Sequence, residues 1–215
     1  MAAVRPHLNV VALNHGEVMA EAGSQVDHAY FPHSGVISTV VETETGGMIE
    51  TAMTGRDGVF NSASALDGKV SFSTGIVQLA GRASAIDVDL LRNVADEFQF
   101  FRSLLIRHEQ VLLAHSQQSA ACNATHSVEA RMCRWLLRIR DLADGDDLVL
   151  AQEFLAQMLG VRRTSVSVVA SSLQAAGLIK YSRGHIRILD IRGLKASSCE
   201  CYAKVKAHYR RLIAN

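Results

Sequence analysis

The segment 148–188 constrains this chain most, because its apolar residues follow two short helical patterns that a single glycine separates. Residues 152–159 carry the first pattern, and residues 163–176 carry the second. Gly160 lies between them, at a sharp turn where a positive φ costs glycine little. Gly177 then marks the end of the second helix. The pattern predicts a helix-turn-helix.

Two short alternating runs follow the second predicted helix and indicate a small β-hairpin. The runs are residues 178–181 and 186–189, and the polar turn 182–185 joins them. In such a unit the start of the second helix reads base edges, and the hairpin, or wing, lies along the phosphate backbone. The alternative is an ordinary helical hairpin whose arginines form a solvated face. The candidate DNA-contacting residues are Arg162, Arg163, Thr164, Ser165, Ser167, Lys180, Arg183 and Arg187.

The charge distribution supports contact with a polyanion through the second half of the chain alone. The net charge is only +1, but its two halves differ in sign. Residues 1–125 carry 7 Lys and Arg against 13 Asp and Glu, whereas residues 126–215 carry 15 against 8. Because nucleic-acid binding depends on neutralising phosphates, we expect double-stranded DNA to meet the C-terminal half.

Composition places the chain among globular proteins. Hydrophobic residues make up 48% of its 215 residues, which is enough for one large or two modest domains. No apolar stretch reaches the length of a transmembrane helix, and the N-terminus lacks a signal-peptide pattern. The four cysteines are not spaced like a disulfide framework. We therefore expect a reduced, cytoplasmic protein without membrane contact.

From about Val10 to Ile86, the sequence pattern predicts short strands. Runs such as 36–41, 48–53 and 74–79 are rich in β-branched residues, and glycine-containing turns separate them. This regular spacing predicts a small antiparallel barrel or jelly roll. Helical character begins near Asp89, and residues 103–123 predict a long helix.

Several segments resemble the Crp/Fnr family of bacterial transcription regulators. Residues 129–137 (EARMCRWLL) are similar to the helix ahead of its DNA-binding motif, and residues 153–163 (EFLAQMLGVRR) resemble one subgroup closely. Tyr30-Phe31-Pro32 and residues 35–38 resemble its sensor domain. The resemblance implies an α+β fold with an N-terminal antiparallel, jelly-roll-like β-roll, a long dimerisation helix and a C-terminal winged helix-turn-helix domain. The implied boundaries are 1–100, 101–125 and 126–215.

The family motif also implies how this chain would read DNA. Arg163 falls at the position that usually contacts guanine. Thr164 stands where many relatives carry a glutamate that reads cytosine, and Val168 stands where a further arginine is common. The resemblance therefore implies a half-site that differs from the best-known one.

The long helix is expected to form the seam of a homodimer, as it does in the resembling family. Its seam would comprise Leu104, Val111, Ala114 or His115, Gln118 and Cys122, which lie near a 3–4 repeat. The seam is imperfect because His108, His115 and Gln118 interrupt it. The alternative is that this helix packs only on its own β-domain.

The ligand cassette of cyclic-AMP-binding relatives is altered here. Arg56 replaces the expected acid, and residues 70–74 contain no arginine to neutralise a cyclic phosphate. An N-terminal iron–sulfur cluster is also not expected, because the first cysteine is Cys122. We therefore expect no cofactor and DNA binding that is independent of cyclic AMP. The candidate pocket for any other ligand comprises Gly55, Arg56, Asp57, Ser73 and Thr74.

The basic tail from residue 191 to residue 215 is expected to be helical. On a helix Cys199 and Cys201 would project about 200° apart, so they could not chelate one ion without partners from elsewhere. We expect a structural or incidental role for them, and no metal.

The sequence predicts a homodimeric, sequence-specific DNA-binding transcription regulator. No catalytic motif stands out, so an enzyme is not expected. Two alternatives remain: a regulator whose β-roll binds a cyclic nucleotide or another small ligand, and an interaction module that uses the helix-turn-helix for packing. RNA polymerase is a candidate partner, and the effector is unknown.

Overall fold

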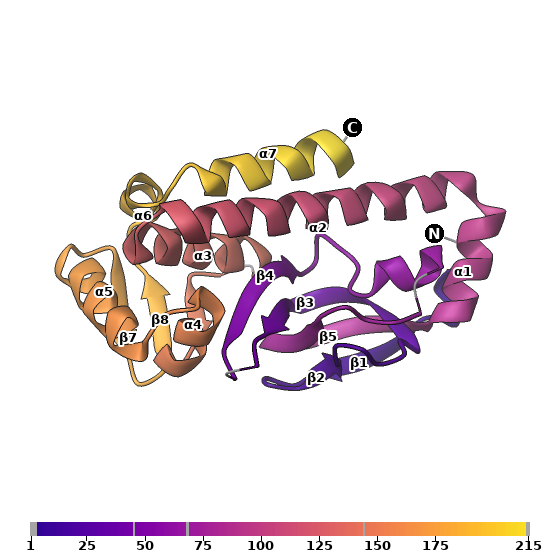
Figure 1. Cartoon of the computed structure of the whole chain (residues 1–215), viewed down its shortest axis with the longest axis horizontal. Coiled ribbons are helices and arrows are strands. Elements are labelled where there is room, and N and C mark those ends of the chain that lie inside the picture. Colours follow the sequence, from indigo (N-terminus) through magenta and orange to yellow (C-terminus); the bar gives the residue numbers. More distant parts are fainter. Residues whose placement is uncertain (1–3, 45, 68, 144, 214–215) are drawn as a thin grey trace.

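The computed structural model describes residues 4–44, 46–67, 69–143 and 145–213 (Figure 1). Its N-terminal part is a five-stranded antiparallel sheet in which β5 is central, with the order β1-β5-β3-β4 and β2 paired to β5. The predicted α+β class with an antiparallel β-roll is confirmed. The strands are β1 (Asn9–Leu13), β2 (Val18–Ala20), β3 (His28–Glu42), β4 (Met48–Thr54) and β5 (Thr74–Asp87), with short 3₁₀ turns η1 (Arg5–His7) and η2 (Ser62–Leu66).

The longest strands, β3 and β5, bend around the sheet because their pairing register shifts in the middle. The shifts lie between Pro32 and Ile37 of β3. Gly35 adopts φ 83° there, and a Cβ atom at this position would lie 2.6 Å from the carbonyl oxygen of Leu79. Only glycine allows the two strands to approach this closely.

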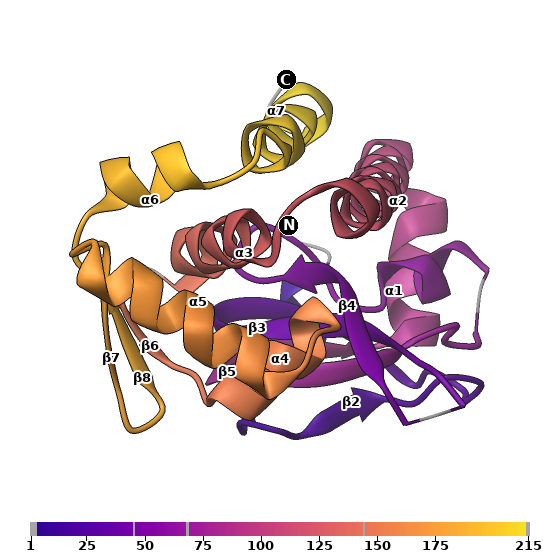
Figure 2. The same ribbon diagram turned by 60° about the vertical axis from the view of Figure 1, so that its left-hand side comes forward.

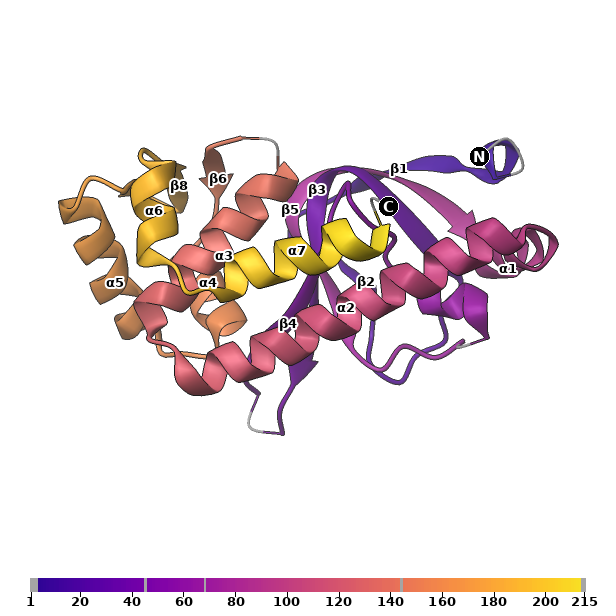
Figure 3. The same cartoon turned by 90° about the horizontal axis from the view of Figure 1, so that it is seen from above.

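Three helices follow the sheet and lead to the C-terminal part. They are α1 (Val88–Glu97), α2 (Gln99–Thr125) and α3 (Val128–Ala143), so the predicted long helix is present and extends further at both ends. Figure 1 shows α2 running the length of the sheet, with α7 (Cys201–Ile213) beside it. Figure 3 shows the same pair from above, with both helices lying over the sheet.

The residues expected to form the dimer seam lie on a face of α2 that this chain covers itself. Val111, His115 and Cys122 are buried, and Leu104 and Gln118 are half-buried. The cover comes from β4, η2 and α7, which all contact α2. The assignment of these residues to an exposed seam is therefore wrong, because the periodicity marks a face that the chain's own sheet and α7 bury.

The predicted continuous helical tail is interrupted. Helix α6 (Ile191–Ser197) ends at Ser198, whose hydroxyl donates to the carbonyl oxygen of Lys195 at 2.9 Å, and α7 starts only at Cys201. A serine hydroxyl that bonds the backbone locally competes with helix continuation. Cys199 consequently lies in the link between α6 and α7 and not on a helix.

A single core connects the sheet to the C-terminal part. Residues 131–137 of α3 are buried without interruption, so this helix is surrounded on all sides. Trp135 and Leu136 belong to the same cluster as Val36 and Met53 of the sheet, and that cluster continues into the helix-turn-helix. Figure 2 shows α3 between the sheet and α6.

Inside this core, Glu50 of β4 connects the sheet to α3. Its carboxylate accepts hydrogen bonds from the indole Nε1 of Trp135 at 2.9 Å and from the hydroxyl of Ser38 at 2.5 Å. Burial raises the pKa of Glu50 from 4.5 to about 7, although both hydrogen bonds and the charges of Arg134 and Arg138 act to lower it. Burial dominates because a charged carboxylate loses its hydration here.

We expect Glu50 to make the folded state less stable as the pH rises. When folding raises the pKa of a carboxyl, its contribution to the free energy of unfolding is complete below pH 4.5. The contribution decreases as the pH rises through 7, and the total decrease is roughly 3 kcal/mol. The pKa values of the buried His108 and His115 are lowered to about 4 and about 3, so these histidines act in the opposite direction. The readout is therefore the difference in unfolding free energy between the wild type and Glu50→Gln.

Urea unfolding of both proteins from pH 4.5 to pH 8 measures this difference. The Gln variant should gain stability relative to the wild type as the pH rises. A difference that stays constant over this range would show that the Glu50 pKa is not raised.

Candidate nucleic-acid interface

The C-terminal part contains two helices joined by a tight glycine turn. Helix α4 (Gln152–Leu159) has the predicted bounds, and α5 (Arg163–Ala175) ends one residue earlier than predicted. Gly160 adopts φ 61°, and its amide donates to the carbonyl oxygen of Gln157 at 3.0 Å. A Cβ atom at Gly160 would also lie 3.0 Å from the side chain of Ile49, so this turn packs on β4. The predicted helix-turn-helix is present.

Helix α5 has one buried and one exposed face. Val166, Ala170 and Leu173 are buried against the rest of the unit. At the N-terminal end of the helix, Arg162, Arg163 and Thr164 are exposed. Two guanidinium groups and a hydroxyl therefore project from the first turn, where the helix dipole also favours an anion.

Two other candidate DNA-contacting residues on α5 have side chains that are less exposed than those of Arg162, Arg163 and Thr164. Ser165 and Ser167 are half-buried, and the hydroxyl of Ser167 donates to Oε1 of Gln152 at 2.7 Å. This bond ties α5 to the start of α4.

Arg163 has only a loose ion pair, with 3.8 Å between its Nη1 and Oε2 of Glu153. Its guanidinium can therefore be redirected toward a ligand at little cost.

The predicted hairpin is present as β7 (Ile179–Ser182) and β8 (His185–Ile188), and β7 contacts α5 (Figure 2). Arg183 and Gly184 form its tip, with φ 46° and φ 82°. These two positive φ angles are typical of a tight hairpin turn. Arg183 is exposed there and free to meet a phosphate backbone.

The hairpin belongs to a three-stranded sheet, because a third strand, β6 (Asp147–Val149), pairs with β8. This strand was not identified from the sequence. Asp147 binds Arg187 through two contacts of 2.6 and 3.0 Å, and the hydrogen bond from Arg187 lowers the pKa of the carboxyl. Lys180 pairs opposite Arg187 and is exposed. Of these two residues, Lys180 is therefore the better candidate for a phosphate contact, because Asp147 partly neutralises the charge of Arg187.

The five candidate pocket residues do not meet in one place. Ser73 lines a cavity of about 310 Å³ between the sheet, η2 and α2. Thr74 is buried and accepts a hydrogen bond from the amide of Ala22. Gly55 packs on Leu142 of α3, Arg56 donates to the carbonyl oxygen of Asp141, and Asp57 forms a 2.9 Å ion pair with Arg138. These three residues face the C-terminal part.

The cavity between the sheet and α2 is acidic. Glu109 lines it and accepts a hydrogen bond of 2.5 Å from the hydroxyl of Ser62, while burial raises the pKa of its carboxyl. Among the described residues that line this cavity, none is lysine or arginine. The cavity therefore lacks a cation for a phosphate group.

Comparison with known proteins decides the class of this interface. Residues 130–197, which include α4, α5 and the hairpin, match the Crp-like helix-turn-helix domain. The C-terminal part of the chain therefore contains a Crp-like helix-turn-helix domain. A search of curated proteins gave no match for this chain.

Solved structures of transcription regulators share the fold of this chain over most of its length. FixK2 from Bradyrhizobium japonicum has a TM-score of 0.76 at 15% identity, covering 89% of this chain and 98% of its own. The CRP-family regulator TTHB099 from Thermus thermophilus has a TM-score of 0.71 at 21% identity, covering 89% and 99%. The c-di-GMP-responsive regulator CLP from Xanthomonas campestris has a TM-score of 0.68 at 15% identity, covering 88% and 97%.

In the part of the chain that the structure describes, none of the helices is both long enough and apolar enough to cross a bilayer.

Proposed function

We propose that this protein is a Crp/Fnr-type transcription regulator, which binds a pseudo-palindromic DNA operator as a homodimer and does so without cyclic AMP. The observation that carries the proposal is the exposed first turn of α5, where Arg162, Arg163 and Thr164 project from a helix-turn-helix. We divide the chain into a β-roll domain (1–100), a dimerisation helix (101–125) and a winged helix-turn-helix domain (126–215). One recognition helix per chain requires two half-sites about one helical turn apart.

The exposed face of α2 supports dimerisation. It contains Ser103, Ile106, Gln110, Leu113 and Gln117, which follow one another at intervals of three and four residues. Ile106 is 42% exposed and Leu113 is 59% exposed, so this face offers two apolar side chains to a partner helix. A 3–4 repeat on one face is the pattern with which two helices pack as a coiled coil. The proposed seam therefore lies beside the face that the chain itself covers.

The chemistry of the β-roll cavity supports independence from cyclic AMP. A cyclic phosphate in this cavity would meet Glu109 and no cationic side chain from the described lining. Arg56 cannot supply the missing charge from its present position, because it is bonded to the carbonyl oxygen of Asp141 on the side of α3. Burying an unpaired phosphate costs several kcal/mol.

The remaining parts of the proposal follow from this role. We propose that the regulator acts without catalysis and in the cytoplasm, that RNA polymerase is a partner at the promoter, and that any effector differs chemically from a cyclic nucleotide.

The dimer is tested by placing a charge on the exposed face of α2. Leu113→Glu should give monomers at micromolar concentration, because two buried carboxylates would face each other in the seam. Light scattering with size-exclusion chromatography measures the mass. Val10→Glu is the matched control, since Val10 is 68% exposed on β1, away from α2, and this variant should remain dimeric. A wild-type protein with the mass of one chain would contradict the proposal.

The roles of the two arginine positions are tested against a library of operator sequences. Arg163→Ala should lose roughly 1–3 kcal/mol of binding free energy and relax the preference at one base pair, because its guanidinium is assigned to a base edge. Arg183→Ala, at the hairpin tip, should weaken binding to all sequences alike. Identical profiles for both variants across the library would show that this division of roles is wrong.

Independence from cyclic nucleotides is tested by calorimetry. No saturable heat is expected with millimolar cyclic AMP or cyclic GMP, since the cavity offers a carboxylate where a cation is needed. The opposite result would be saturable binding coupled to at least a tenfold gain in operator affinity, about 1.4 kcal/mol.

A further inference from the structure

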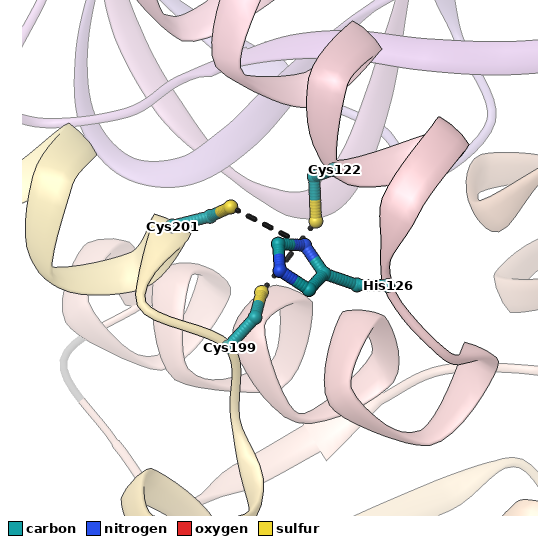
Figure 4. A group of neighbouring side chains, drawn as sticks. All are labelled: Cys122, His126, Cys199 and Cys201. Atoms are coloured by element: carbon teal, nitrogen blue, oxygen red, sulfur yellow. Dashed lines mark hydrogen bonds between the residues drawn. The ribbon is translucent and has the colours of Figure 1, made fainter.

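Four side chains of metal-binding type meet where α2 ends and α7 begins (Figure 4). Cys122 lies in the last turn of α2, and His126 follows four residues later as the residue that ends the helix. Cys199 lies in the short link after α6, and Cys201 is the first residue of α7. The ligand atoms of all four residues lie within 4.8 Å of one another.

The distances fit a single tetrahedral ion. The sulfurs of Cys122 and Cys199 are 3.5 Å apart, and the sulfur of Cys201 is 3.6 Å from Nδ1 of His126. In a zinc site with Zn–S and Zn–N bonds of about 2.3 and 2.0 Å, tetrahedral angles place two sulfurs about 3.8 Å apart and a sulfur and a nitrogen about 3.5 Å apart. These two pairs therefore already lie close to the required spacing, and the other ligand atoms lie within 4.8 Å of them.

Residues around the four side chains also support a metal site. Nε2 of His126, the nitrogen that does not face Cys201, is 3.2 Å from Oε2 of Glu200. Histidines that bind metals usually place their second nitrogen against a carboxylate in this way. The side-chain amide of Gln118 donates to the sulfur of Cys201 at 3.0 Å. A hydrogen bond of this kind stabilises a thiolate.

A simple apolar contact between cysteines explains the cluster less well. Cys122, Cys199 and Cys201 are buried and pack on Ala130, as small apolar residues do. However, His126 and Gln118 direct polar nitrogens to the same sulfur, which an apolar cluster does not require. Cys133 provides the contrast, because it is buried in the main core among apolar residues and lies outside the cluster.

We propose that Cys122, His126, Cys199 and Cys201 bind one zinc-class ion. Three soft thiolates and an imidazole favour zinc over the oxygen-binding magnesium and calcium. Because all four positions are filled by the protein, the site is of the closed, structural kind. A cluster with several irons would hold its ligands further apart than 4.8 Å.

The ion would join parts of the chain that control the DNA-binding unit. His126 lies between α2 and α3, so the site ties the end of the long helix to the start of α7. Arg131 of α3 carries a charge close enough to interact with Cys122 and Cys199, and its guanidinium donates to the carbonyl oxygen of Leu159 at the end of α4. The ion would therefore fix the junction from which the helix-turn-helix extends.

An ion can reach this site from solvent. Cys199 and Glu200 line an open groove along α7. The three sulfurs are buried, whereas Glu200 lies at the surface. The coordination shell is therefore closed, and a path for entry of the ion lies beside it.

The proposal is tested on the full chain purified with a phosphine reductant, by counting metal per chain and by titrating cobalt(II). We expect close to one zinc per chain and, with cobalt, the visible bands of a tetrahedral ion with a thiolate-to-metal charge-transfer band. Cys122→Ala should lose both signals. Glu200→Gln, a change at an exposed side chain, should keep the cobalt spectrum and weaken zinc affinity roughly tenfold or more.

Cys133→Ala is the matched control, and it should retain one zinc per chain. Three results would overturn the proposal. The first is a wild-type chain that holds less than a tenth of a zinc ion per chain after zinc addition and gives no cobalt spectrum. The second is a loss of zinc in Cys133→Ala equal to that in Cys122→Ala, and the third is a disulfide between Cys122 and Cys199 that persists under reductant.

Discussion

The burial of Glu50 between the sheet and α3 is the contact on which the rest of the structure depends. A carboxylate in the core is tolerated only because Trp135 and Ser38 donate to it and Arg134 and Arg138 lie near it. Such a polar pairing has few alternative geometries, whereas apolar packing alone permits sliding. It therefore fixes α3 on the sheet, and α3 in turn carries the packing face of α5. The orientation of the recognition helix follows from this chain of contacts.

The long helix α2 has two faces with different surroundings. One face is covered by the sheet, η2 and α7, and the neighbouring face exposes Ile106 and Leu113. The covered face joins the β-roll to the junction at His126, and the exposed face is available to a second chain. The four potential metal ligands lie where α2 ends.

The parts of the fold with local signals could be predicted from the sequence. Gly160 and Gly177 marked the turn and the end of α5, because positive φ is costly for other residues. The seam on α2 could not be placed, since periodicity identifies apolar faces but not which neighbour covers them. Strand β6 was missed because it has only three residues and begins at an aspartate that resembles a turn residue.

The cysteine cluster also could not be predicted from the sequence. Cys122 and His126 lie one helical turn apart, which was a usable signal, but Cys199 and Cys201 were placed on a continuous helix. The break at Ser198 turns both sulfurs to one side, and only the packing of α7 on α2 brings the two pairs together. Ligand sets assembled from segments about 75 residues apart depend on tertiary structure, which sequence spacing does not describe.

The measurement that tests the central claim most directly is the salt dependence of operator affinity. Two recognition helices and two hairpins on one duplex should neutralise several phosphates. The logarithm of the association constant should then fall linearly with the logarithm of salt concentration, with a slope of roughly −4 or steeper. An affinity that does not change with salt, or no binding at low salt to any member of a random duplex pool, would contradict the account.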